Sequence, residues 1–456
     1  MKKFSLLAVF VLMLMSITPA FAQDRTVVTW FVGLGTGTNE QQIAAQNAVV
    51  EAFNESQEEI ELVINIGANF ETSRDTFSTL VAAGNAPDIV GPVGVGGSNA
   101  YIDVWADLTP LVEASGYDLS AFDPALVDLY RSDDALYGIP FAVFPSVTYY
   151  NRNLFDEAGA NYPPASFDEM YIMPDGSEVE WNYETIRELA MYMTVDADGN
   201  DATMDEFDPN NVVQFGMNFQ WAQPRLIWTD IQPEDFYDED ANSITIPESW
   251  RTANEWLQAA VWTDSFIPNT TYDSSELLNS GNAFSSGNVA MAIAPLWYTC
   301  CLDSAVGNFE FDFGVVPKSL DGEYHVATDA DTFRMTKDSK NPEAAFVVLS
   351  YLLDEAVPEL TPFYGAFPAR PEYQQGFLDG LLERYPWDLQ LNIPTDSLAY
   401  NNPGNQHHES YFPNWQEGQD AIGAYNTRLF GETGADLDIQ AELDALEAEL
   451  NEIIQN

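Results

Sequence analysis

The sequence predicts an α/β protein of two lobes, each a mostly parallel sheet flanked by helices. Short strands rich in β-branched residues alternate with amphipathic helices early in the chain, which is the pattern of parallel α/β folds. The length of 456 residues suits two domains with substantial cores. A hydrophobic content of 46%, with 13% aromatic residues, indicates ordinary globular packing.

Residues 1–22 have the features of a secretory signal peptide. Two lysines precede an apolar run over residues 4–15, and the small residues Ala20 and Ala22 mark a cleavage site. A membrane anchor needs about 20 apolar residues without such a site, and Pro19 interrupts this run. We expect cleavage after Ala22 and a periplasmic or secreted mature protein that is not inserted in the membrane. No cysteine near this end could carry a lipid anchor.

The chain is strongly acidic. Its 72 Asp and Glu against 16 Lys and Arg give a formal net charge of −56, and loss of Lys2 and Lys3 with the signal peptide would make it −58. Such a field repels nucleic acid and anionic lipid, which excludes both as partners. The carboxylates are spread along the whole chain, so they favour a solvated acidic surface over capture of cations. Composition alone does not separate adaptation to salt from simple solubility.

The first elements follow in a regular alternation. Strands are expected at residues 26–32 and 61–66, and a third begins at Ile89. Helices are expected at residues 40–54 and 72–83, where apolar residues recur at helical spacing. Consecutive strands joined by helices run parallel in one sheet.

The turn at residues 33–37, Gly-Leu-Gly-Thr-Gly, invites a nucleotide-binding interpretation because it follows a strand. Its spacing lacks the third glycine of the dinucleotide fingerprint, and a turn before a helix needs glycine in any case. We therefore set dinucleotide binding aside.

The stretch from 136 to 159 separates one lobe from the next. It predicts an extended segment at residues 139–144, a second β-rich run at 147–150 and a helix at 151–158. We expect the chain to cross between the lobes near Val143.

Three segments carry a resemblance to a known family. They are APDIV at residues 86–90, YGIPF at residues 137–141 and SKNPEAAF at residues 339–346. In this order they resemble the sugar-binding branch of bacterial extracellular solute-binding proteins, the maltose-binding-protein-like family. The resemblance implies a two-lobed periplasmic-binding-protein-like fold with a ligand cleft between the lobes, and a loop at residues 91–98 that faces the cleft. It also implies hinge closure on a saccharide and delivery to the permease subunits of an ABC transporter.

The resemblance also implies a division of the chain. The first lobe would comprise residues 23–143 and 318–354, and the second lobe residues 144–317 and 355–456. Crossings are then expected near Val143, at Pro317 and after about Asp354.

The later elements fit this division. Strands are expected at residues 212–219, 289–294 and 311–316, and Pro342 opens a helix that runs to about Asp354. The last segment predicts a packing helix, with apolar residues at helical spacing: Leu443, Leu446, Leu450 and Ile453. A coiled-coil oligomer needs more turns than this segment has, so we expect a monomer.

Aromatic residues dominate the candidate binding site. A sugar ring presents flat C–H faces beside a rim of hydroxyl groups, so it suits aromatic side chains together with amides and carboxylates. Each aromatic residue near a strand end could instead belong to the core. The resemblance points to positions where relatives contact ligand, although Phe144 replaces a carboxylate of the maltose-type receptor, so the same ligand preference does not follow. The predicted ligand-binding residues are Phe144, Gln220, Trp221, Trp297, Tyr298, Asp329, Tyr364 and Phe367.

Cys300 and Cys301 are the only cysteines of the chain. In an oxidising compartment each has its neighbour as its only intramolecular partner. The alternatives are a vicinal disulfide, which would stand at the cleft wall, and two buried thiols. Zinc is not expected, because the three histidines are not suitably spaced with the cysteines.

One acidic segment is a candidate calcium site. Asp196, Asp198, Asn200 and Asp205 place oxygen atoms at intervals similar to those of calcium loops. The glycine comes too early for an EF-hand and the terminal glutamate is missing, so an acidic turn between a helix and a strand is the alternative. No other cofactor is required.

Two other function classes are weighed against a sugar receptor. No nucleophile elbow, phosphate loop or HExxH helix marks an enzyme, and no pair of carboxylates stands out for a glycoside hydrolase. A receptor for a polyamine or an oligopeptide is the second interpretation, and acidic side chains facing the cleft would favour it.

Overall fold

The computed structural model describes residues 25–132, 135–401 and 406–455. The predicted signal peptide, residues 1–22, lies outside the described residues. Within the described ranges, no helix combines the length and the apolar character that a membrane crossing requires.

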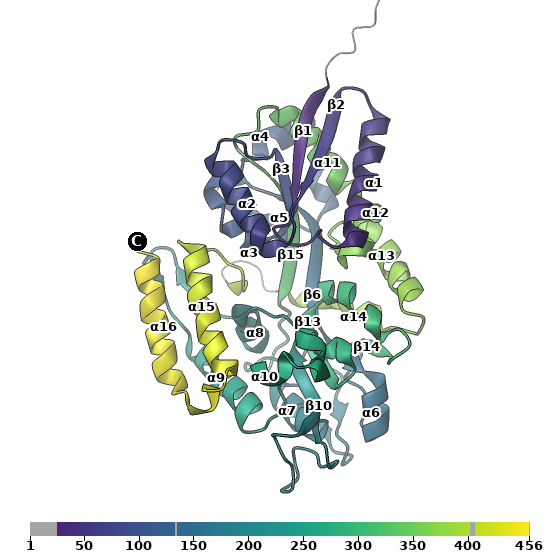
Figure 1. The fold of residues 1–456 in the computed structure, drawn as a ribbon, viewed down its shortest axis with the longest axis vertical. Coiled ribbons are helices and arrows are strands. Elements are labelled where there is room, and N and C mark those ends of the chain that lie inside the picture. The colour runs from purple at the N-terminus through teal and green to yellow at the C-terminus, as the bar shows by residue number, and fades with distance from the viewer. Residues whose placement is uncertain (1–24, 133–134, 402–405, 456) are drawn as a thin grey trace, which may run out of the picture.

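The first half of the molecule is a parallel sheet with helices on both sides (Figure 1). Strand β1 (Thr26–Val32) lies between β2 (Ile60–Ile66) and β3 (Ile89–Gly94) and is parallel to both. Helices α1 (Glu40–Ser56) and α2 (Phe70–Ala82) connect them, as the sequence predicts. Asn39 caps α1 through the backbone N–H of Gln42, which fixes where that helix begins.

Strand β6 (Ile139–Asn151) joins the two halves, and every one of its residues is buried. Residues 139–145 pair with β15 (Thr328–Met335), whereas residues 146–151 pair with β13 (Val289–Pro295) and β14 (Phe311–Gly314). The two extended segments predicted here are therefore one continuous strand. Its change of partner comes between Pro145 and Ser146, close to the expected crossing at Val143.

The second half continues the same run of strands. Its order is β2-β1-β3-β15-β6-β13-β10-β9, where β10 (Val212–Phe219) is parallel to β13 and β9 (Val195–Asp196) is the edge. The antiparallel pairs gather around β6 and β15, where the chain passes between the halves. The covering helices are α6 (Arg152–Ala158), α7 (Tyr183–Tyr192), α8 (Pro224–Ile231), α9 (Glu248–Trp262), α15 (Trp415–Phe430) and α16 (Ile439–Ile453).

The helices after β15 return to the first half and to β6. Helix α11 (Pro342–Leu353) contacts β1 and β15, and α12 (Val357–Tyr364) packs against α1, where Gln46 Nε2 donates a hydrogen bond to Tyr364 Oη at 2.9 Å. Strand β16 (Phe367–Pro368) then pairs with β6 and leads into α13 (Pro371–Arg384) and α14 (Asn392–Ser397). The lobe boundaries stay a prediction; helix α12 contacts both α1 and the turn Leu296–Cys301 of the second half.

The last helix packs as predicted. Leu443, Leu446 and Leu450 of α16 are buried, and Ile453 is partly buried. The remaining short elements are α3 (Val95–Asn99), α4 (Thr109–Ser115), α5 (Pro124–Asp128), α10 (Thr270–Asp273) and the hairpin strands β4 (Arg131–Ser132), β5 (Ala135–Leu136), β7 (Tyr171–Ile172), β8 (Glu178–Val179), β11 (Tyr237–Asp238) and β12 (Ser243–Ile244).

Candidate ligand-binding cleft

A cleft of about 940 Å³ lies between the two halves. The first half contributes the turn after β1, at residues 34–36, and the glycines that end β3 and form α3. The second half contributes Trp221, Trp297 and the exposed turns of α15. The predicted loop at residues 91–98 faces this cleft, because Gly94, Gly96 and Gly97 line it. Open sheets bind ligands beyond the carboxyl ends of their strands, and β1 and β3 both end here.

Two tryptophans form an aromatic wall. The rings of Trp221 and Trp297 are nearly parallel, at 10°, with centroids 6.4 Å apart. Tyr298 supports both rings edge-on, with centroids 5.5 Å and 6.4 Å away. Trp221 is 48% exposed and has a φ of 55°, in the left-handed region that few non-glycine residues adopt. Its indole N–H donates to the carbonyl of Gly281 at 2.7 Å, which holds the exposed ring in place.

Asp329 joins this wall to a histidine. Trp297 Nε1 donates to Asp329 Oδ2 at 2.6 Å, and His408 Nε2 lies 2.6 Å from Asp329 Oδ1. Burial alone would raise the pKa of Asp329, but His408 and the two hydrogen bonds outweigh it and lower that pKa. Each carboxylate oxygen of Asp329 therefore has a partner from the protein.

Two further carboxyl groups, Asp331 and Glu409, form an acidic floor beside Asp329. A Cβ atom placed on Gly94 would lie 3.4 Å from Asp331 Oδ1 and 3.8 Å from Glu409 Oε1, so both groups border the same glycine. Burial, together with the charge of Asp329, raises the pKa of Asp331 to about 7 and that of Glu409 well above its usual range. Glu409 Oε2 is buried without a hydrogen-bond partner.

The loop that carries His408 and Glu409 is fixed by buried groups. His407 Nδ1 accepts from the backbone N–H of Glu409 at 3.0 Å and its Nε2 donates to the carbonyl of Thr328 at 2.8 Å, which identifies the neutral tautomer. Burial lowers the pKa of His407 to about 3, in keeping with that state. Arg225, 1% exposed, donates to Ser410 Oγ at 2.9 Å and to the Ser410 carbonyl at 3.2 Å.

The cleft brings together most of the predicted ligand-binding residues, but not all. Phe144, Trp221, Trp297, Asp329 and Tyr364 line it. Three others do not, and each has a different task. Gln220 is buried and hydrogen-bonded to Asn218, Gly281 and Phe284. Tyr298 donates a hydrogen bond to Asn282 at 2.6 Å. Phe367 packs in the core against Phe377.

Sequence reasoning missed several residues that line the cleft. They are the ionisable residues Arg225, His408 and Glu409 and the aromatic residue Trp415, and none was predicted as a ligand residue. His408 and Glu409 follow no strand and match no motif, so only the folded chain brings them to Asp329. A signal existed for Asp331, because it lies two residues after Asp329, which was predicted as a ligand residue.

Cys300 and Cys301 form a disulfide in the turn Leu296–Cys301, which confirms the vicinal pairing. Cys300 lines the cleft, and its carbonyl accepts a hydrogen bond from Arg384 Nη2 at 2.7 Å. Helix α12 ends against this turn. A Cβ atom on Gly365, the residue after the helix, would lie 2.7 Å from the carbonyl oxygen of Trp297. Gly365 also has a φ of 61°, in the left-handed region. Glycine is therefore required where the two halves meet beside the disulfide.

The candidate calcium loop is organised by its own hydrogen bonds. Asp196 Oδ1 accepts from the backbone N–H groups of Asp198 and Asn200, and Oδ2 accepts from Asn200 Nδ2 and the N–H of Asp208, at 2.9–3.0 Å. Burial raises the pKa of Asp196, but these bonds lower it to about 2. Asp198 and Asp205 are exposed. The loop does not fit a calcium ion well, because donors of the protein already occupy the buried carboxylate of Asp196, and the second buried carboxylate, Asp201, accepts from Thr203.

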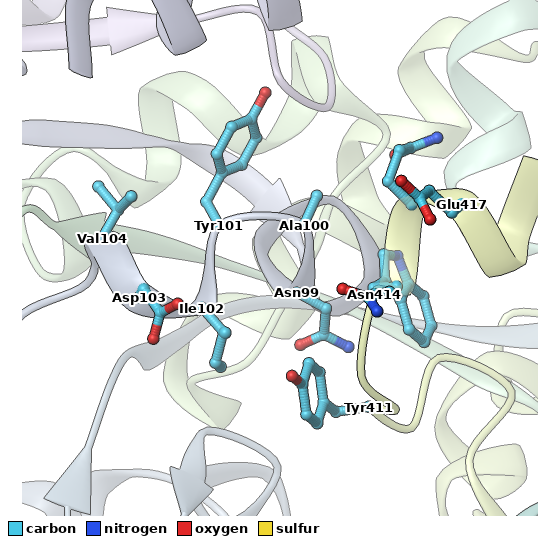
Figure 2. A pocket seen from close by; sticks show the side chains of 11 residues that line it. Asn99, Ala100, Tyr101, Ile102, Asp103, Val104, Tyr411, Asn414 and Glu417 are labelled. Carbon is cyan, nitrogen blue, oxygen red and sulfur yellow. The ribbon is translucent and has the colours of Figure 1, made fainter. Parts of the chain in front are cut away.

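A smaller pocket of about 370 Å³ adjoins the cleft. It shares Ala100, Trp415 and Gln416 with the cleft and continues between the segment after α3 and the start of α15. Figure 2 shows Tyr411 next to Asn99, and Glu417 farther to the right. The binding space therefore extends beyond the aromatic wall and the acidic floor.

Comparison with known proteins identifies the family. The sequence profile described as bacterial extracellular solute-binding protein matches residues 48–386, well over half of the chain. The chain belongs to the bacterial extracellular solute-binding proteins. A binding protein of Brucella abortus (strain 2308) is 23% identical over 286 residues, which are 61% of this chain and 59% of that protein. The matched region thus spans about three fifths of the curated relative.

Solved structures of solute-binding proteins share the fold. An ABC substrate-binding protein of Listeria monocytogenes, in complex with cycloalternan, has a TM-score of 0.73 at 21% identity and covers 94% of this chain and 99% of its own. The maltose/maltodextrin-binding domain of Bdellovibrio bacteriovorus, bound to maltotriose, has a TM-score of 0.67 at 17% identity. The match covers 94% of this chain and 100% of that domain. These similarities confirm the predicted two-lobed fold.

Proposed function

We propose that the protein is an extracytoplasmic receptor that binds a saccharide between its lobes and delivers it to the permease of an ABC importer. The observation that carries this proposal is the pair of parallel tryptophan rings, the exposed Trp221 and the partly buried Trp297, in a cleft that also holds carboxylates. Aromatic faces bind the C–H faces of sugar rings, and carboxylates accept hydrogen bonds from hydroxyl groups. The family and the sugar-bound structures that share the fold support the same class of ligand.

Closure of the cleft would complete the site. Each lobe supplies part of the wall, so a ligand that touches both lobes binds the closed form more tightly and shifts the population towards it. The cleft volume is near the upper end of the range of about 300–1,000 Å³ for small-molecule sites, and the smaller pocket adds to it. An oligosaccharide therefore suits the space better than a single ring.

We propose a binding protein and not a hydrolase. Two carboxylates that could act on a glycosidic bond need a general acid and a base or nucleophile on opposite sides of that bond. Asp331 and Glu409 border one glycine on one side of the cleft, and Asp329 is occupied by Trp297 and His408. This arrangement suits binding.

A polyamine receptor is the second candidate, because acidic side chains do face the cleft. A thermal-shift screen of the mature protein against monosaccharides, oligosaccharides, polyamines and peptides separates the two. A ligand at a hundredfold excess over its dissociation constant stabilises the fold by about 2.7 kcal/mol, which raises the melting temperature measurably. Stabilisation by a saccharide that is recovered intact supports the proposal. Stabilisation by polyamines or peptides alone would overturn it.

A further inference from the structure

The acidic floor of the cleft has more acceptors than donors. Asp331 and Glu409 lie beside Gly94, and Glu409 Oε2 is buried with no hydrogen-bond partner. His408 is 3% exposed and its Nδ1 also has no partner, while its Nε2 contacts Asp329. A carboxylate oxygen such as Glu409 Oε2 accepts hydrogen bonds and so suits an N–H or O–H donor of a ligand. The empty positions at this floor therefore call for a ligand rich in N–H or O–H donors.

Burial outweighs the positive charge that the protein brings to Asp331 and Glu409. His408 Nε2 lies against Asp329 Oδ1. Burial and the charge of Asp329 both disfavour the ionised form of Asp331. Arg225 faces the loop carbonyls and stands over the ring of Phe236 at 4.5 Å. The N–H of Gly96 and the charge of Arg225 favour the ionised form of Glu409 but are outweighed.

The floor is contiguous with the aromatic wall. Asp329 bonds to Trp297 on one side and to His408 on the other, and all three line the same cleft. A ligand that stacks on the tryptophans therefore brings its substituents to Asp331 and Glu409.

From this geometry we propose that the ligand is an amino sugar, a saccharide whose ammonium group binds between Asp331 and Glu409 while its ring stacks on Trp221 and Trp297. This inference rests on the proposed saccharide receptor and names its ligand class. An ammonium offers three N–H donors and no acceptor, which matches the excess of acceptors. It also brings the positive charge that two neighbouring, partly buried carboxyl groups need in order to ionise together.

A neutral sugar and a metal ion match the floor less well. A hydroxyl group supplies one donor and carries no charge, so the carboxyl groups would stay protonated or repel each other. His407, His408 and Glu409 each place one ligand atom within 4.8 Å of the others. However, both ring nitrogens of His407 already take part in hydrogen bonds, which leaves too few free ligands for a closed metal site.

The test is calorimetry of the mature protein with matched sugars. The probes are glucose, galactose and mannose and their disaccharides, each beside its 2-amino-2-deoxy form and its N-acetylated form. We expect at least one free amine to bind at least about tenfold more tightly than both its counterparts at neutral pH, equivalent to about 1.4 kcal/mol. Proton release, measured in buffers of different ionisation enthalpy, should accompany the amine only, because its charge drives a protonated carboxyl group to ionise.

Variants of Asp331 and Glu409 test whether these residues cause the preference for the amine. Asp331→Asn and Glu409→Gln should remove the preference for the amine and the proton release. Asp379→Asn, an exposed residue of α13 that removes the same charge, should change neither. Equal binding of amine and neutral sugars, or an amine preference that survives in both floor variants, would overturn the inference and leave the sugar receptor standing. Binding of polyamines or of zinc without any sugar would overturn both.

Discussion

Trp297 is the residue that links the two halves of the binding chemistry. Its ring forms the aromatic wall with Trp221, and its indole N–H donates to Asp329, which in turn contacts His408. Stacking and the hydrogen bond can be separated, because phenylalanine keeps a ring and lacks the donor.

We expect Trp297→Ala to weaken saccharide binding by about tenfold to a hundredfold, since an aromatic contact is worth about 0.5–1.5 kcal/mol beyond the apolar area it buries. Trp297→Phe should fall between this variant and the native protein. Calorimetric titration with the sugar found in the screen measures both. Trp256→Phe, which alters a tryptophan that packs on Tyr183, is the control and should bind normally. Native affinity in Trp297→Ala would show that the wall does not contact the ligand.

Asp331 should make the fold sensitive to pH. Its folded pKa of about 7 lies above the value of about 3.9 in an unfolded chain. Between these values the folded state holds a proton that the unfolded state has lost, so this residue's contribution to stability is full below about pH 4 and is lost as the pH rises towards 7.

We therefore expect Asp331→Asn to raise the melting temperature by about 2–4 °C at neutral pH and by much less near pH 4. Differential scanning calorimetry at both pH values checks this. A variant that melts below the native protein at neutral pH would mean that Asp331 is paired in the folded state. A gain in stability with a loss of amine binding is the trade-off typical of a functional residue.

The candidate residues show how far sequence reasoning reaches at this scale. Trp221 and Trp297 were predicted from the family resemblance and do line the cleft. Their chain neighbours Gln220 and Tyr298 were predicted with them and point into the protein instead. A shift of one residue along a strand end or a tight turn reverses the direction of a side chain, and a loose motif match does not resolve that shift.

Among the elements, the short helix α3 is shaped by its partner across the cleft. A Cβ atom on Gly96 would lie 2.6 Å from Glu409 Oε1, which is shorter than a van der Waals contact between carbon and oxygen. Asn99, at the end of the same helix, donates to the carbonyl of Glu409 at 2.8 Å. The glycine therefore lets the Glu409 carboxyl group rest on the helix backbone.

We expect Gly96→Ala to displace Glu409 and to lower the affinity for the ligand at least about tenfold, equivalent to about 1.4 kcal/mol, while the protein still folds. Gly376→Ala in α13 is the matched control, because no atom lies within 4 Å of the added methyl group. That change should leave binding unaltered and stabilise the helix by up to about 1 kcal/mol. Titration and thermal melting of the two variants give both readouts. Unchanged affinity in Gly96→Ala would separate Glu409 from ligand binding.

Helix α8 places Arg225 where it holds the loop of His408 and Glu409. Its guanidinium donates to the carbonyl and hydroxyl of Ser410, and lysine cannot span both positions. We expect Arg225→Lys to lower the free energy of unfolding by about 1–3 kcal/mol, the cost of leaving buried partners unsatisfied, and to weaken ligand binding. Denaturant unfolding and titration measure the two effects. Arg428→Lys changes an exposed pair with Glu442 and should cost less than about 1 kcal/mol. A similar small cost for Arg225→Lys would contradict this role.

Elements with a strong local pattern were predictable and those defined by pairing were not. The first strands and helices have nearly the predicted ends, because β-branched runs and caps mark them. Strand β6 was expected as two pieces, since Pro145 falls in its middle. Proline is tolerated at this point because the strand changes its partner from β15 to β13 there.

For the whole molecule, the order of family motifs was enough to predict two lobes and a cleft. The acidic floor was not predictable, because Gly96 and Glu409 are far apart in the chain and meet only after the last third of the chain returns to the cleft. The same return brings α12 onto α1, a contact that the sequence alone does not display.

The net charge of the whole chain leads to the last prediction. With 72 acidic residues against 16 Lys and Arg, most carboxylates have no cation to pair with, so the folded surface repels itself. Salt screens this repulsion over a distance of about 30 Å at 0.01 M and about 3 Å at 1 M. The compact state concentrates the charge more than the unfolded chain does, and screening therefore favours folding.

We expect the melting temperature to rise by several degrees between low salt and about 1 M sodium chloride, where the Debye length is shorter than most distances between carboxylates. Tetramethylammonium chloride at equal ionic strength is the control, because a bulky cation screens equally well but does not bind carboxylates as sodium does. Equal rises in the two salts would assign the effect to screening. A rise with sodium alone would assign it to bound cations, and a flat curve in both would mean that the acidic surface carries little repulsion in the folded state.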